Sequence, residues 1–239
     1  MTRYPPARIR VAGRRRHAFR RRLLAWYRRE RRDLPWRRTR NPYHVLVSEI
    51  MLQQTPVARV IPKYREWLAH YPSLRALARA GAAEVRERWR PLGYNVRPIR
   101  LREIARTAQR KYGGRIPRSR EELLVLKGVG PSTAGAVLSF AFGQDAPILD
   151  TNVRRVLRRV FFGDAARPAE RVLWSLASML LPRGRAYDFN QALMDIGATV
   201  CTARRPRCAA CPLARLCTSY PLLTILSRGS RCPQTEPRP

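Results

Sequence analysis

The feature that most constrains this chain is a group of four cysteines near its C-terminal end. Cys201, Cys208, Cys211 and Cys217 have the spacing C-x6-C-x2-C-x5-C. Four thiolates so close in sequence can hold one metal centre. Structural zinc usually uses two separated C-x2-4-C pairs, whereas compact all-cysteine spacing suits an iron–sulfur cluster at least as well. Spacing alone leaves both kinds of site open.

A set of buried cysteines without a metal is a poorer interpretation, because the segment is too polar for a core. Four arginines lie in it, namely Arg204, Arg205, Arg207 and Arg215. A fifth cysteine, Cys232, makes the total odd. An odd number argues against the disulfide framework of a secreted protein.

The charge of the chain limits its partners. The 239 residues include 49 Lys and Arg against 16 Asp and Glu, which gives a formal net charge of +33. A surface so positive repels itself unless it meets a polyanion, and nucleic acid is the polyanion we expect. A membrane surface or a ribosome is the alternative.

The sequence predicts no membrane or export signal. No apolar stretch reaches the length of a membrane span, and no hydrophobic segment follows the arginine-rich N-terminus. We therefore expect a cytoplasmic, nucleoid-associated protein of a prokaryote, without a membrane partner. We also expect a monomer.

Apolar residues recur at helical spacing along most of the chain, so the predicted class is all-α. The predicted helices cover 17–32, 45–52, a run from near Pro56, 73–80, 83–90, 98–112, 119–126, 132–142, 152–162, 168–181 and 187–200. There is no alternating strand pattern and no internal repeat. Residues 1–16 are expected to form a disordered basic arm, and 218–239 a tail.

A glycine-containing turn lies between two of these helices, in the segment 126–134. Gly128 and Gly130 predict a tight turn whose amides point outward, and a helix that begins near Ser132 adds its own free N–H groups. Such a hairpin can hold a DNA phosphate without reading the bases. A helix connection that only turns the chain is the alternative.

Two carboxylates have unusual surroundings. Glu49 lies in the apolar run 45–52, where Glu is rarely buried without a reason; the wet face of an amphipathic helix is the alternative. Asp150 precedes a helix and could be a plain N-cap. We predict that the helix N-terminus lowers the pKa of Asp150, and that apolar surroundings raise the pKa of Glu49. Such a pair suits acid-assisted cleavage of a glycosidic bond.

At this point the residues resemble one family, the MutY adenine DNA glycosylases, which are helix-hairpin-helix base-excision enzymes. The resemblance rests on Leu34-Pro35-Trp36-Arg37, Asn41-Pro42-Tyr43, the segment 48–55, the hairpin Gly128–Ala134, the segment 148–153, the segment 189–195 and the four cysteines. It covers about residues 18–217, in order. In that family the four cysteines bind a [4Fe–4S] cluster.

The resemblance implies a two-lobed all-α fold. One lobe would join 17–34 to 148–217 and carry the cluster loop, 201–217. The other would be a helical barrel, 35–147, with the helix-hairpin-helix at about 120–140. Double-stranded DNA with a mismatched or damaged base pair would lie across the cleft between them, with the target base flipped out of the stack.

The resemblance also implies residue roles. Glu49 would protonate the adenine, Asp150 would stabilise positive charge on the sugar, and Asn152 would support that site. The base pocket would contain Trp36, Arg37 and Ser132, and the DNA contacts would come from Gln53, Gln54, Gly128, Gly130, Thr133 and Arg154. Relatives that also cut the strand have a Lys where Ser132 stands, so we expect a glycosylase without lyase activity.

Two other interpretations remain. Only 22 residues follow Cys217, fewer than the 8-oxoguanine-reading domain of MutY needs. Thymine/uracil mismatch glycosylases also lack that domain, but they generally have Tyr at the position of Ser132 and lack the pair Gln53-Gln54, which favours adenine.

The second alternative is a non-catalytic, cluster-bearing DNA-binding protein, which the presence of both Glu49 and Asp150 disfavours.

Overall fold

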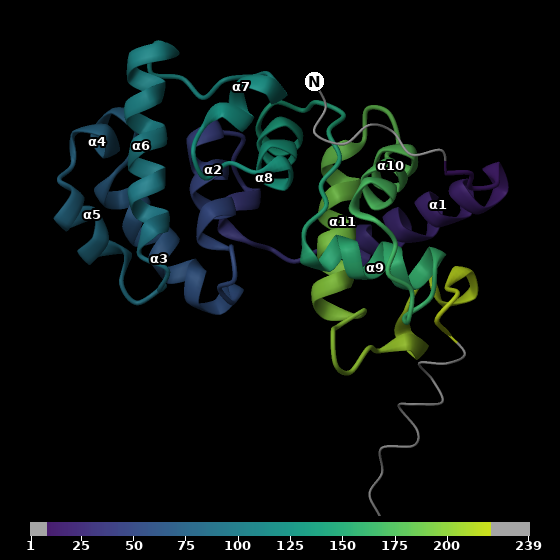
Figure 1. The fold of residues 1–239 in the computed structure, drawn as a ribbon. Coiled ribbons are helices and arrows are strands. Elements are labelled where there is room, and N and C mark those ends of the chain that lie inside the picture. Colours follow the sequence, from purple (N-terminus) through teal and green to yellow (C-terminus); the bar gives the residue numbers. More distant parts are fainter. Residues whose placement is uncertain (1–8, 221–239) are drawn as a thin grey trace, which may run out of the picture. The chain divides into compact units, whose positions relative to one another are not determined.

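The computed structural model describes residues 9–220. Within that range the chain is helical and contains no strand, so the predicted all-α class is confirmed (Figure 1). The α-helices are α1 (Gly13–Glu30), α2 (Pro42–Met51), α3 (Val57–His70), α4 (Leu74–Arg79), α5 (Ala82–Trp89), α6 (Val96–Lys111), α7 (Arg120–Val125), α8 (Pro131–Ala136), α9 (Thr151–Phe161), α10 (Glu170–Leu180) and α11 (Ala186–Thr199). Among these residues no helix is both long and apolar enough to cross a membrane.

Four short segments complete the described part. They are η1 (Pro35–Arg37), η2 (Val137–Ala141), η3 (Cys208–Ala210) and η4 (Ala214–Leu216). The predicted helix 132–142 is divided, because α8 gives way after one and a half turns to the π-helical η2. The other predicted helices match to within a few residues at each end.

The described residues form two compact units. Unit 1 contains 9–31, 149–182 and 188–220, and unit 2 contains 32–148 and 183–187. Compared with the predicted lobes, the main difference is the segment 183–187. It belongs to unit 2 because the Gly184 amide donates to both carboxylate oxygens of Asp145 at 3.0 Å, and because Tyr187 packs edge-on against Phe140.

The core of unit 1 is built from α1, α9, α10 and α11. On α1, Phe19 lies four residues before Leu23, and Trp26 and Tyr27 lie three and four residues after it, so they share one helix face, and all are buried. Phe19 is fully buried and packs edge-on against Phe189 of α11 at 6.2 Å. Burying each such side chain contributes about 1.5–3 kcal/mol.

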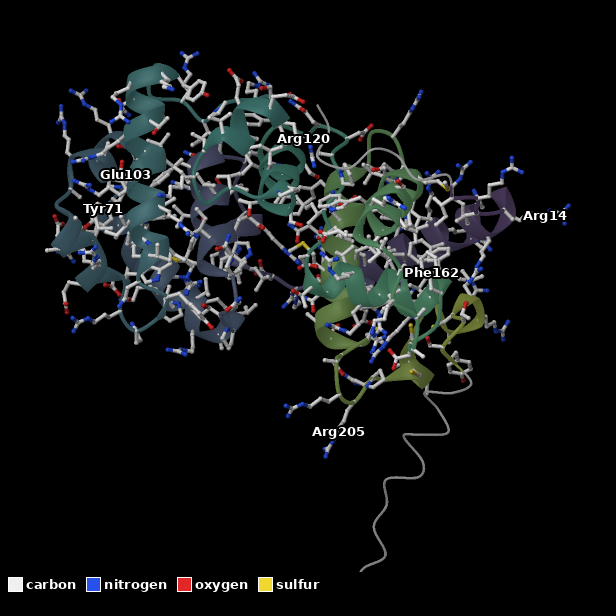
Figure 2. All side chains as sticks on the ribbon, in the orientation of Figure 1. Arg14, Tyr71, Glu103, Arg120, Phe162 and Arg205 are labelled. Atoms are coloured by element: carbon white, nitrogen blue, oxygen red, sulfur yellow. The ribbon has the colours of Figure 1, made fainter. Side chains whose placement is uncertain are left out.

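The expectation of a disordered arm over 1–16 is wrong for its last four residues. α1 begins at Gly13, not at residue 17, so Arg14–Arg16 form its first turn. The guanidinium of Arg15 donates to the carbonyls of Val160 at 2.8 Å and Leu216 at 2.9 Å, which anchors this turn. Arg14 points away from the ribbon (Figure 2). Residues 1–8 lie outside the described part.

The predicted tail also begins too early. The amides of Thr218 and Ser219 donate to the carbonyls of Val160 and Arg159 at 3.1 and 3.2 Å, so these residues pack against the end of α9. Residues 221–239, including Cys232, lie outside the described part.

In unit 2, α2 is the central helix and packs against η1, α3, α6, α8 and η2. It begins at Pro42, three residues before the predicted start, because Asn41 caps it by accepting from the Tyr43 amide at 2.9 Å. Most of its side chains are buried. The close contact of α8 with the segment before Asp150 requires Gly135, since a Cβ there would lie 2.3 Å from the Pro147 oxygen.

Candidate active site and cysteine cluster site

Asp150 caps the N-terminus of α9. Its Oδ1 accepts a hydrogen bond from the Val153 amide at 2.7 Å. The predicted lowering of the Asp150 pKa is wrong. Burial raises the pKa, although the Val153 and Asn152 amides and the nearby charge of Arg155 oppose it. The amides at the helix terminus therefore orient the Asp150 carboxylate, but they do not offset the effect of its lost hydration on the pKa.

A partly buried network of hydrogen bonds surrounds the residue two positions on, Asn152. Arg155 donates from Nη2 to Asn152 Oδ1 and to the Gly197 carbonyl, both at 2.7 Å, and from Nε to the Cys201 carbonyl at 2.7 Å. α9 and α11 approach closely here, because a Cβ on Gly197 would lie 2.6 Å from that of Asn152. One arginine therefore links the Asp150 end of α9 to the first cysteine.

The arginines of α9 include the predicted DNA contact Arg154, and the structure places them differently. Arg154 is half-exposed and pairs with Glu170 at 3.1 Å. Arg158 and Arg159 both pair with Asp164, at 2.7 and 2.8 Å. The Arg154 side chain is thus more exposed than that of Arg158, and Arg159 is buried. Sequence reasoning missed the internal role of Arg155, because nothing in the helix period distinguishes it from its neighbour.

The four cysteines line one cavity, together with apolar side chains of α9 and α11 such as Val156 and Ile196. None of the four forms a disulfide. Burial raises the pKa of Cys211 to about 12 and also raises the pKa of Cys208 and Cys217. Burial thus favours the protonated form of these three thiols, and binding a metal centre releases protons from its thiol ligands.

A buried arginine lies at the wall of this cavity. In residues 9–220, no three His, Cys, Asp or Glu side chains converge closely enough to hold one metal ion. Instead, Arg159 is buried at the cavity wall and donates to the Cys201 sulfur at 3.6 Å and to the Thr202 carbonyl at 2.7 Å. A guanidinium beside sulfur ligands suits a thiolate-bound cluster of net negative charge.

The loop that carries the cysteines is polar on its outer side. Arg204, Arg205 and Arg207 are exposed between the first two cysteines, and Arg215 is exposed before the last. Figure 2 shows Arg205 extending away from the ribbon. This exposure agrees with the expectation that the segment is not a core.

The hairpin between α7 and α8 has the predicted tight turn. Gly128 has φ +101°, and the Val129 amide donates to the Leu126 carbonyl at 3.0 Å. Gly130 caps α8, and Ser132 in its first turn is half-exposed. The side chain of Thr133 is buried, so its predicted DNA contact could come only from its backbone.

The remaining predicted site residues lie in unit 2, around α2. Glu49 is half-buried on α2, which contacts both η1 and α8, the elements that carry Trp36 and Ser132. Trp36 is buried and packs edge-on against Tyr64 at 5.5 Å. Arg37 donates to the Arg32 carbonyl at 2.9 Å. The structure thus brings Glu49, Trp36, Arg37 and Ser132 onto adjoining elements.

Two models of known families match the chain. The first, described as HhH-GPD superfamily base excision DNA repair protein, covers residues 47–179, more than half of the chain. The chain belongs to the HhH-GPD superfamily. The second model, the iron–sulfur binding domain of endonuclease III, covers residues 201–217. It confirms the predicted [4Fe–4S] cluster over zinc, and membership of a DNA repair family makes DNA the partner.

Individual HhH-GPD relatives are similar over most of the chain. An adenine DNA glycosylase of Mycolicibacterium smegmatis is 46% identical over 219 residues, which cover 90% of this chain and 75% of that protein. The human adenine DNA glycosylase is 49% identical over 84% of this chain, but the chain spans only 39% of its length. The solved structure of a thermostable thymine-DNA glycosylase has a TM-score of 0.83 and 36% identity, and covers 88% of this chain and 98% of that one.

Proposed function

We propose that this chain is a DNA glycosylase that removes adenine paired with guanine or 8-oxoguanine in double-stranded DNA. The observation that carries the proposal is the identity with adenine DNA glycosylases, 46% for the Mycolicibacterium smegmatis protein over 90% of the chain and 49% for the human protein over 84%. The reaction would hydrolyse the N-glycosidic bond and leave an abasic site.

Glu49 would act as the general acid. Proton transfer from its carboxyl to a ring nitrogen of adenine makes the base a neutral leaving group, which takes the electron pair of the glycosidic bond as that bond breaks. Water then adds to the sugar carbon and releases a proton. The half-buried position of Glu49 on α2 supports this role, because its surroundings reduce its contact with bulk solvent.

Asp150 would stabilise the positive charge that develops on the sugar. Its burial supports this role, since a carboxylate that has lost water interacts more strongly with a new positive charge than one in solvent. The stabilisation is largest when that charge is present, so it favours the transition state over the bound substrate. Asn152 would hold this end of α9 in place.

The product would keep an intact strand. Strand cutting through a covalent intermediate needs an amine nucleophile, and the hydroxyl of Ser132 stands where related enzymes place that amine. Alkali treatment tests this point: we expect strand breaks at the target site only after alkali.

A thymine/uracil glycosylase is the second candidate. It is favoured by the thymine-DNA glycosylase structure, whose length this chain matches almost completely, at 98% coverage. Single-turnover assays on duplexes with A·8-oxoguanine, A·G, T·G and U·G pairs decide between the two. Base release from the first two supports adenine excision, and release only from the last two would overturn it.

The remaining expectations, a monomer and a cytoplasmic, nucleoid-associated location in a prokaryote, are further proposals. The formal charge of +33 supports a location on DNA. Sedimentation of the purified chain with and without duplex tests the monomer, and a dimer in either sample would contradict it.

A further inference from the structure

Arg97, in the first turn of α6, is a buried arginine surrounded by oxygens. Only 4% of the residue is exposed. Its guanidinium donates to the carbonyls of Ile50 (3.2 Å), Met51 (3.0 Å), Leu92 (3.0 Å), Gly93 (3.1 Å) and Gln53, and to Thr55 Oγ1 (3.1 Å). Each of these acceptors is uncharged. Taking a positive charge out of water is unfavourable, and these acceptors carry no negative charge to offset that cost. The burial of Arg97 therefore suggests a role beyond stability.

The acceptors belong to two separate segments. The first is the end of α2 with the turn that follows it, 50–55, and the second is the turn before α6, 92–93. The last carbonyls of a helix have no partner within the helix and carry partial negative charge. The planar guanidinium presents five donors in a fixed fork, which lets it serve both segments at once; a lysine ammonium has only three donors at one point.

Each segment contains or adjoins a residue in the left-handed region of φ. Gln54 has φ +56° and Tyr94 has φ +49°, and neither is a glycine. Such conformations are uncommon for residues with a Cβ and persist where the surroundings hold them. Both side chains are exposed, Tyr94 to 61%, and the Tyr94 ring centroid lies 5.2 Å from the Arg97 guanidinium carbon.

We propose that Arg97 is a positioning residue, which holds Gln54 and Tyr94 in the arrangement that engages the mismatched base pair. An amide can hydrogen-bond to a base edge, and an aromatic ring can stack on a base that has lost its partner. Holding both side chains before DNA arrives reduces the ordering cost of binding. The inference rests on the proposed function, because it concerns how the same chain selects its substrate.

The test compares Arg97→Lys with Arg102→Lys. Arg102 is also buried on α6, but its guanidinium bonds to the Ala80 carbonyl and to Glu103, away from both turns. Kd is measured for a duplex with a non-cleavable A·8-oxoguanine pair and for the fully matched duplex. A 2-aminopurine beside the mismatch reports base unstacking by its fluorescence.

We expect Arg97→Lys to reduce the ratio of the Kd for the matched duplex to the Kd for the mismatched duplex by on the order of tenfold. We also expect a smaller increase in 2-aminopurine fluorescence on binding. Arg102→Lys should leave both nearly unchanged. In a Gln54→Ala background, the effect of Arg97→Lys should be much smaller, because coupled residues are not additive. Equal effects of Arg97→Lys and Arg102→Lys, or full additivity with Gln54→Ala, would overturn the inference.

Thr55→Val provides a milder variant if Arg97→Lys does not fold. It removes one acceptor of Arg97 and keeps the size of this buried side chain. A reduced Kd ratio in Thr55→Val supports the inference, and an unchanged ratio overturns it. Failure of the proposed function looks different: the wild-type chain would then release no adenine from the A·8-oxoguanine or A·G duplex, while the binding ratio and its response to Arg97→Lys would remain measurable.

Discussion

The guanidinium of Arg155 donates to Asn152 Oδ1 at 2.7 Å, and through its Nε to the Cys201 carbonyl, also at 2.7 Å. Asn152 lies two residues after Asp150, the cap of α9, and Cys201 is the first of the four candidate cluster ligands. A single side chain therefore fixes the distance between the candidate catalytic turn and the start of the cluster loop. This contact is a route by which the cluster loop would affect the candidate catalytic turn without taking part in the chemistry.

Replacement of Arg155 should consequently impair both sites. For Arg155→Gln we expect a base excision rate about 10–100-fold lower, in the range typical for residues that orient metal ligands, together with faster loss of the cluster's visible absorbance. Arg158→Gln is the control, because Arg158 pairs with Asp164 and does not contact Asn152. If both variants lose activity equally, the contact with Asn152 has no special role.

Replacement of Glu49 should separate chemistry from binding. Glu49→Gln keeps the shape of the side chain but has no proton to donate, so we expect base release to fall by at least about 10²–10⁴-fold, the contribution of a general acid. Affinity for duplex DNA should remain close to that of the wild type. Single-turnover rates and a binding titration measure the two effects, and an unchanged rate would exclude Glu49 as the acid.

We expect Asp150 to lower the stability of the folded protein while it increases the rate of base release. Burial raises its pKa, so between the usual aspartate pKa and this raised value the folded state binds more protons than the unfolded state. The free energy of unfolding therefore falls as pH rises through that window. Asp150→Asn has no such charge, and Asn is an equally good N-cap. We expect this variant to have a higher Tm at neutral pH, with a smaller difference in acid.

The same variant should release adenine more slowly, on the order of 10²–10³-fold, as expected on loss of a group that stabilises developing charge.

Asp164→Asn provides a contrast of opposite sign. Its hydrogen bond with Arg159 lowers the pKa of Asp164, so that carboxylate stabilises the fold at neutral pH and the benefit is lost as pH falls. A lower Tm for Asp150→Asn at neutral pH would contradict the interpretation.

Most of the fold could be predicted because its signals are local. The spacing of Phe19, Leu23 and Trp26 indicates a helix without knowledge of its partners, and Asp150 is recognisable as a cap from the residues directly after it. The role of Arg155 could not be predicted, since two of its three acceptors, the Gly197 and Cys201 carbonyls, lie more than 40 residues away on α11 and beyond. The first turn of α1 was missed for the same reason, because Arg15 bonds to residues far along the chain.

The hairpin glycine Gly128 offers a final prediction. Its φ is +101°, and a Cβ there would lie 2.9 Å from the Arg100 side chain. The substitution Gly128→Ala therefore introduces backbone strain, about 1–2 kcal/mol for a left-handed alanine. It also places the new Cβ so close to Arg100 that the Arg100 side chain is displaced. Gly143→Ala is the matched control, because Gly143 also has a positive φ, +67°, but has open space around it. We expect a larger loss of Tm for Gly128→Ala.

Binding should distinguish these two variants further. A hairpin that holds a phosphate contributes equally to matched and mismatched duplexes, since it does not read the bases. Gly128→Ala should therefore weaken binding to both duplexes by the same factor, and Gly143→Ala should weaken neither. A loss confined to the mismatched duplex would show that the hairpin acts on the base pair itself and would contradict its role as a phosphate site.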